Sequence, residues 1–89
     1  MIEVLKFSAT WCGPCRMLSQ ALEGIEGITN IDIDLQPKLA VEYNIRNIPI
    51  IIFKVNDKIV HRQAGLLTKK QYKSLIKEIQ NSKELWEND

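Results

Sequence analysis

Two cysteines, Cys12 and Cys15, are the residues of this 89-residue chain whose type and spacing favour covalent chemistry. The thiolate is the reactive form of cysteine, and an ordinary thiol with a pKa of about 8.5 is mostly protonated at neutral pH. Pro14 suits the first turn of a helix, so Cys12 is predicted at a helix start, where unpaired N–H groups and the positive dipole end favour an anion. Cys15, one turn further along, is predicted to face the core. We therefore expect an exposed Cys12 to attack a substrate disulfide and a shielded Cys15 to resolve the mixed disulfide.

A purely structural role and a metal-binding role for the cysteine pair have less support. Cysteines often serve as small buried apolar side chains, but the segment Trp-Cys-Gly-Pro-Cys couples this pair to a helix start. A zinc site needs about four ligands. The chain offers two cysteines and one histidine, His61, which is predicted to lie exposed on a distant strand. We expect no metal site.

The elements that must position the cysteines alternate between strands and helices. Residues rich in β-formers or alternating in polarity predict strands over 2–7, 29–35, 48–53 and 58–63, and helices are predicted to begin after Cys12, at Pro37 and at Thr68. The opening strand, helix and strand imply a parallel pair with a right-handed crossover. Asn56 and Asp57 predict a hairpin turn, so the sheet is mixed. The polar tail, 81–89, is expected to fray.

Composition predicts the class of protein. The chain is 45% apolar and 26% charged, as expected for one compact domain over residues 1–89. Its formal net charge is +1 with the lysines spread along the chain, which disfavours nucleic-acid binding. No leader sequence or membrane span is predicted, so we expect a cytoplasmic monomer in which a close cysteine pair does redox chemistry.

The chain resembles the thioredoxin family. The resemblance is carried by residues 7–17, which surround Trp11-Cys12-Gly13-Pro14-Cys15, by 43–49, which end in Ile48-Pro49, and by Gly65 after the last strand. It implies that Cys12 is the attacking thiol, that Cys15 is the resolving thiol and that Ile48-Pro49 is a cis peptide facing them. The residues that it implies for substrate binding are Trp11, which would cover the site, Gly13, Pro14, Ile48, Pro49 and Gly65. An extended substrate would pair with the backbone of Ile48 as an added strand.

Departures from the family pattern define the expected fold and one open question. We expect a thioredoxin-like α/β fold, a four-stranded mixed sheet flanked by three helices, without the family's usual N-terminal strand and helix. The strand at 29–35 should then be a sheet edge. Lys6 occupies the position of a buried aspartate that many thioredoxins use to help deprotonate the second thiol. Lys6 is a candidate pKa modulator: as an ammonium it would stabilise thiolates, and as a neutral amine it would take a proton. Alternatively, its stem lies along the core and its head lies in water.

Three functions are compatible with these features. The first is a protein-disulfide reductase that binds no cofactor and receives electrons from NADPH through thioredoxin reductase, with ribonucleotide reductase among its clients. The second is a glutaredoxin-like protein reduced by glutathione, which the short length suggests. Against it, Cys-Gly-Pro-Cys and Ile48 stand where glutaredoxins typically have Cys-Pro-Tyr-Cys and a threonine. The third is a thioredoxin-like binding subunit without catalysis.

Overall fold

The computed structural model describes residues 1–82, which have an α/β fold. The elements are β1 (Ile2–Ser8), α1 (Gly13–Ala21), β2 (Ile28–Asp32), α2 (Pro37–Glu42), β3 (Ile50–Val55), β4 (Lys58–Ala64) and α3 (Lys69–Asn81). The predicted fraying of the tail falls mostly on 83–89, outside the described residues. The first residue of that tail, Asn81, is the last residue of α3.

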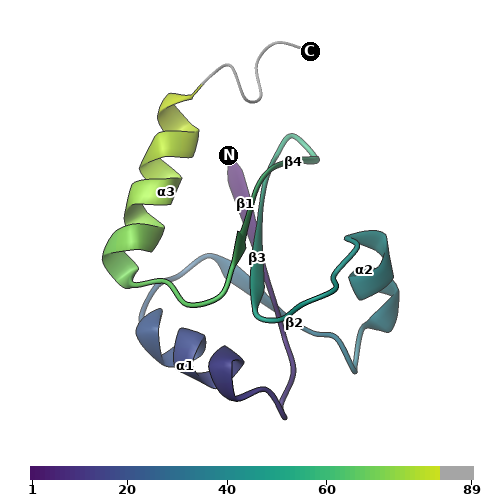
Figure 1. The fold of residues 1–89 in the computed structure, drawn as a ribbon. Helices are drawn as coiled ribbons and strands as arrows, with labels where there is room; N and C mark the ends of the chain where they lie inside the picture. Colours follow the sequence, from purple (N-terminus) through teal and green to yellow (C-terminus); the bar gives the residue numbers. More distant parts are fainter. Residues whose placement is uncertain (83–89) are drawn as a thin grey trace.

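The four strands form one mixed sheet in the order β2-β1-β3-β4. β1 pairs with β2 in parallel and with β3 antiparallel, and β3 and β4 form the antiparallel hairpin. This topology confirms the predicted four-stranded mixed sheet and the edge position of β2. Figure 1 shows α1 and α3 on one face of the sheet and α2 on the other. The central strand β1 therefore leads directly into the segment that carries Cys12 and Cys15.

Alternating side chains of the central strands fill a separate core on each face of the sheet. One core joins Val4 and Phe53 to side chains of α1 and α3. The other joins Leu5 and Phe7 to the α2 region. Lys6 follows this alternation and lies on the face covered by α1, the same face as Val4.

Local hydrogen bonds explain where the elements end. The predicted strand over 29–35 is too long, because Asp32 turns the chain: its backbone oxygen accepts from Leu35 N at 3.1 Å and its Oδ1 accepts from Asp34 N at 2.8 Å. The hairpin turn is confirmed by positive φ angles at Asn56 (53°) and Asp57 (66°), which suit a two-residue turn with the twist of the strands. At the start of α3 the predicted capping box is present in both directions.

Candidate redox site

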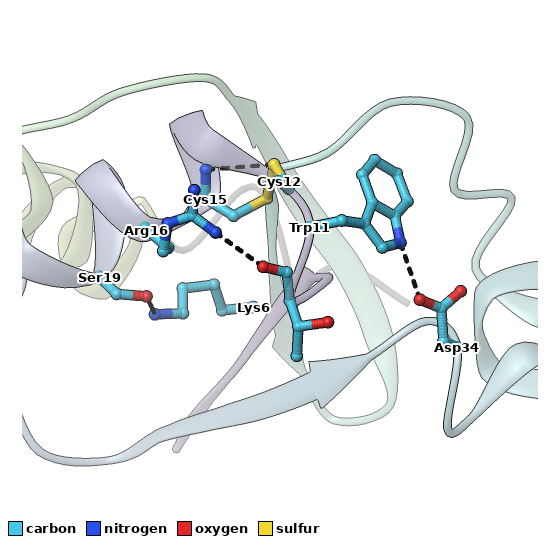
Figure 2. The surroundings of a disulfide bond; sticks show 8 residues. Lys6, Trp11, Cys12, Cys15, Arg16, Ser19 and Asp34 are labelled. Carbon is cyan, nitrogen blue, oxygen red and sulfur yellow. Dashed lines mark hydrogen bonds between the residues drawn. A yellow bond between two sulfur atoms is a disulfide. The ribbon is translucent and has the colours of Figure 1, made fainter.

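The cysteine pair lies at the junction between β1 and α1, and a disulfide joins the two sulfurs (Figure 2). Their Cα atoms are 5.2 Å apart. Cys12 is the N-cap residue of α1, and its Sγ accepts a hydrogen bond from the backbone N–H of Cys15 at 3.2 Å. An N-cap sulfur that accepts from the first helical turn can hold negative charge well, because the helix N-terminus presents unpaired donors and a positive dipole end.

Short contacts fix the loop that carries the pair. The backbone N–H of Cys12 donates to Ala9 O at 3.2 Å. The guanidinium of Arg16 donates to Thr10 O at 2.8 Å, which ties the first turn of α1 back to the loop. Pro14 lies in the first turn of the helix, as predicted, where its missing N–H removes no helical hydrogen bond.

The two cysteines differ less in exposure than the sequence predicts. In the disulfide form Cys12 is 6% exposed and Cys15 is 2% exposed, so the expectation of an exposed Cys12 is wrong for this state. Both pack with Ala9, and Ile33 and Ile48 pack against this cluster. A partner disulfide must therefore approach through the small exposed part of Cys12, and the surfaces beside it decide which partners fit.

Trp11 lies beside the disulfide and is 65% exposed. Its indole Nε1 donates to Asp34 Oδ2 at 2.8 Å, so the ring is held to the side of the sulfurs (Figure 2). The prediction that Trp11 covers the site is therefore not met in this state. Sequence reasoning missed Asp34, which falls within the strand predicted over 29–35. The signal for the turn is Asp32, because an Asp side chain commonly accepts a hydrogen bond from the backbone two residues further on, as Asp32 does from Asp34.

The segment around Pro49 lies against the pair, as the family resemblance implies. The Ile48-Pro49 peptide is cis. Ile48 is half-buried against the cysteine cluster, and Pro49 is buried. Gly65 has a φ of 80°, and its N–H donates to Pro49 O at 3.1 Å. Gly13 has no heavy atom within 4 Å of where a Cβ would lie, so the helix start is open. Segments distant in sequence are thus brought to one end of the sheet.

Lys6 is buried on the α1 side of β1, with 6% of the residue exposed. Its Nζ donates to the hydroxyl of Ser19 at 2.7 Å (Figure 2). Burial lowers the pKa of Lys6, because a desolvated ammonium is less stable than a solvated one. Within the described residues no hydrogen bond joins the amine to either sulfur. Its partner is the hydroxyl of the exposed Ser19, and Lys6 lines a solvent-open cavity of about 440 Å³.

The surface around the cysteines is shallow. A solvent-open cavity of about 360 Å³ lies beside Cys15, between Ser19 of α1 and Asp32 of β2. A larger cavity, about 650 Å³, lies between β4 and α3 and does not include the cysteines. Small-molecule sites usually enclose most of their ligand, and this shallow surface does not. It is better suited to a disulfide on the surface of another protein.

His61 lies apart from the cysteines and is half-buried rather than exposed as predicted. Its ring stacks obliquely on Phe53 at 5.7 Å, and Nε2 lies 3.1 Å from Gln63 Oε1. Within residues 1–82 no group of three or more His, Cys, Asp or Glu side chains has the arrangement of a metal site. In the same part of the chain, no helix combines the length and apolarity needed to cross a membrane.

Comparison with known proteins agrees with this geometry. The family model described as Thioredoxin matches residues 2–78. A thioredoxin of Chlamydia trachomatis is 38% identical over 82 residues, covering 85% of this chain and 78% of that protein. A thioredoxin of Mycoplasmoides gallisepticum is 32% identical over 80 residues, covering 83% of this chain and 80% of that protein.

Solved structures show the same likeness. A mutant thioredoxin from Halobacterium salinarum superposes with a TM-score of 0.76 at 29% identity, over 86% of this chain and 73% of that one. A structure described as thioredoxin-2, a component of malaria parasite protein secretion machinery, has a TM-score of 0.81 at 25% identity, over 88% of this chain and 82% of that one. With a cysteine pair joined at the start of α1 and relatives matched over most of their length, the chain belongs to the thioredoxin family and is a thiol-disulfide oxidoreductase with Cys12 and Cys15 as its redox-active pair.

Proposed function

We propose that the chain reduces disulfides of client proteins in the cytoplasm, with Cys12 as the attacking thiol, and that thioredoxin reductase returns it to the dithiol with electrons from NADPH. The observation that carries the assignment of roles is the hydrogen bond from Cys15 N to Cys12 Sγ at the N-cap of α1. The same contact in the reduced protein would stabilise a thiolate on Cys12. Cys15 is the more buried of the two residues and lies inside the helix, which suits the resolving role.

The reaction is an exchange of sulfur bonds in two steps. The Cys12 thiolate attacks one sulfur of the client disulfide, so that a Cys12–client bond forms, the client S–S bond breaks and the released client thiolate takes a proton. Cys15 then loses its proton and attacks Cys12 Sγ, which forms the Cys12–Cys15 disulfide and releases the second client thiolate. Two electrons pass from the dithiol to the client, and the reductase later supplies two.

The client chain is proposed to bind along Ile48, beside Trp11, Gly13, Pro14, Pro49 and Gly65. Ile48 supports this because it packs against the cysteine cluster while keeping part of its surface exposed. The open surface over Gly13 supports it as well. An extended client segment laid beside Ile48 would present its disulfide to Cys12.

Trapping tests the assignment of roles. In Cys15→Ser the second step is blocked, so a mixed disulfide with a client, for example ribonucleotide reductase, should accumulate. The matched Cys12→Ser variant should trap none. Equal trapping by the two variants would contradict the assignment, and full function of the double variant would indicate a binding subunit instead.

A coupled assay tests the source of electrons. Reduction of a disulfide-bonded protein such as insulin should consume NADPH when thioredoxin reductase is present. Glutathione with glutathione reductase should support much slower turnover. The reverse preference would show the glutaredoxin-like function and refute the proposed reductase. Fractionation of the source cells tests the cytoplasmic location, and gel filtration tests the monomer.

A further inference from the structure

Lys6 is the one charged residue within residues 1–82 that the fold buries, and the exchange steps above make no use of it. Isolated buried cations are unfavourable, because protein replaces the water that solvates the charge. Lys6 forms no ion pair within the described chain. Its amine donates to the neutral hydroxyl of Ser19 at 2.7 Å. Its positive charge is therefore not neutralised by direct contact.

The position of Lys6 relates its charge to the cysteine pair. Ser19 follows Cys15 by four residues in α1, so the two side chains lie on the same helix face. Figure 2 shows the amine of Lys6 reaching Ser19 on the helix turn next to Cys15. The cavity of about 440 Å³ that Lys6 lines and the cavity of about 360 Å³ that Cys15 lines share Ser8 and Ser19. Lys6 and Cys15 thus line adjoining cavities, and no hydrogen bond joins the amine to either sulfur in the described residues.

Other charged groups around these two cavities come from α1, the turn after it and β2. Glu23 lines the cavity beside Lys6, and Asp32 and Arg16 line the cavity beside Cys15. Arg16 donates to Thr10 O, and Asp32 accepts from Asp34 N through Oδ1. None of these groups forms a salt bridge with Lys6 in the described residues, and only Lys6 is buried.

We propose that the buried ammonium of Lys6 stabilises the thiolate form of the Cys12–Cys15 pair through space, and so makes the disulfide easier to reduce. A positive charge favours a nearby thiolate and has less effect on the uncharged disulfide. Stabilising the reduced form makes a dithiol pair a stronger oxidant. The inference rests on the proposed exchange through this pair, and Lys6 is a positioning residue that acts on the sulfurs through its field.

The expected size follows from Coulomb's law. For two unit charges on the order of 10 Å apart at an effective dielectric constant of about 20, Coulomb's law gives a pKa shift of roughly one unit. Water in the shared cavities reduces this effect. We therefore expect removal of the charge to raise the pKa of the first thiol to ionise by about one unit. We also expect the equilibrium with glutathione to move about three- to tenfold toward the disulfide.

The test compares three variants of the full chain. Lys6→Met removes the charge at similar length, Lys6→Arg keeps it, and Ser19→Ala removes the hydrogen bond while keeping the amine. Ultraviolet absorbance of the thiolate against pH gives the thiol pKa. Equilibration with mixtures of reduced and oxidised glutathione gives an equilibrium constant. The reaction is that of the protein disulfide with two glutathione molecules, which forms the protein dithiol and oxidised glutathione. Lys6→Met should shift both readouts as stated, and the other two variants should stay within about twofold of the parent protein.

Several results would overturn the inference. It fails if Lys6→Met leaves both readouts unchanged, if Lys6→Arg shifts them as far as Lys6→Met does, or if Ser19→Ala alone reproduces the shift. Slower resolution with unchanged equilibrium would show that Lys6 accepts a proton instead. Lys6→Gln replaces Lys6→Met if the latter does not fold, as judged by urea unfolding. Failure of the parent protein to form a reversible disulfide would refute the proposed function itself, which is a different outcome.

Discussion

Reduction of the disulfide should destabilise the fold by an amount that the size of its ring sets. The chain has two cysteines, and their bond closes a ring with a sequence separation of 3, about as short as a helical disulfide can be. In the chain-entropy model a ring of this size restricts the unfolded chain by about 2 kcal/mol, compared with about 3 kcal/mol for a 15-residue loop. A chain of 89 residues has a total stability of roughly 4 to 13 kcal/mol. The disulfide therefore supplies a measurable fraction of it.

Urea unfolding of the oxidised and reduced protein measures this contribution. At pH 5.5, with a phosphine reductant in one sample, both thiols stay largely protonated, so chain entropy is separated from thiolate charge. The oxidised form should unfold at a urea concentration about 1 to 2 M higher. In thermal scans it should melt roughly 8 to 16 °C higher. The matched control is the Cys12→Ser, Cys15→Ser double variant. Its urea midpoint should be close to that of the reduced protein and should not change when the reductant is added.

Equal midpoints for the two forms at pH 5.5 would refute the entropy argument. The pH dependence adds a second check. If the folded protein lowers the pKa of a thiol, the reduced form gains stability above the unfolded pKa of about 8.5 and loses it as pH falls through the folded value. The difference between oxidised and reduced forms should therefore shrink as pH rises toward 8.5. It should shrink less in Lys6→Met.

Three further changes test the packing and electrostatics of the fold. Leu18→Ala, at a fully buried position of α1, should cost about 3 to 5 kcal/mol in urea unfolding, whereas Met17→Ala at a neighbouring 56% exposed position should cost less than about 0.5 kcal/mol. Thr68→Ala removes the N-cap of α3 and should cost about 1 kcal/mol by the same measurement. Burial raises the pKa of Tyr72 above its ordinary value of 10.0. The unfolded chain therefore ionises first, and the free energy of unfolding falls as pH rises through 10.0. In Tyr72→Phe, a plot of the free energy of unfolding against pH should lose that contribution to its slope between about pH 9 and 11.

Patterns in the sequence predicted most of the elements because each had a local cause. The capping box at the start of α3 needs only Thr68 and Gln71, and both hydrogen bonds are present at 3.1 and 2.8 Å. Pro14 and the turn residues Asn56 and Asp57 likewise act within a few residues of themselves. Local hydrogen bonding and backbone preference are readable from a single sequence for this reason.

Features that depend on tertiary packing were harder to predict. The alternation over 29–35 indicates a strand, but the chain turns at Asp32, whose side chain competes for the backbone. The cis peptide at Ile48-Pro49 followed from the family resemblance, since X-Pro bonds are rarely cis without a specific context. The hydrogen bond between Trp11 and Asp34 joins residues that are far apart in the sequence, and no local pattern predicts their contact. The burial of Cys12 also reflects neighbours from other segments, Ile33 and Ile48.

Lys6 shows how a charged residue at a buried position can indicate function. Its neighbours Val4, Leu5 and Phe7 are apolar and buried, and packing alone would favour another apolar residue at its position on the α1 side of the sheet. A lysine there is less stable as a cation than the same lysine in water, as the direction of its pKa shift indicates. A residue that breaks the local pattern without an ion-pair partner is expected at functional sites more than elsewhere.

The group near Lys6 that gains from an uncompensated positive charge is a thiolate of the cysteine pair. If so, the unfavourable burial of the ammonium should be relieved on reduction, and the pKa of Lys6 should be higher in the dithiol form than in the disulfide form at alkaline pH. NMR titration of the Lys6 side chain in the two redox states measures that difference, and identical titration curves would show that the amine does not sense the sulfurs.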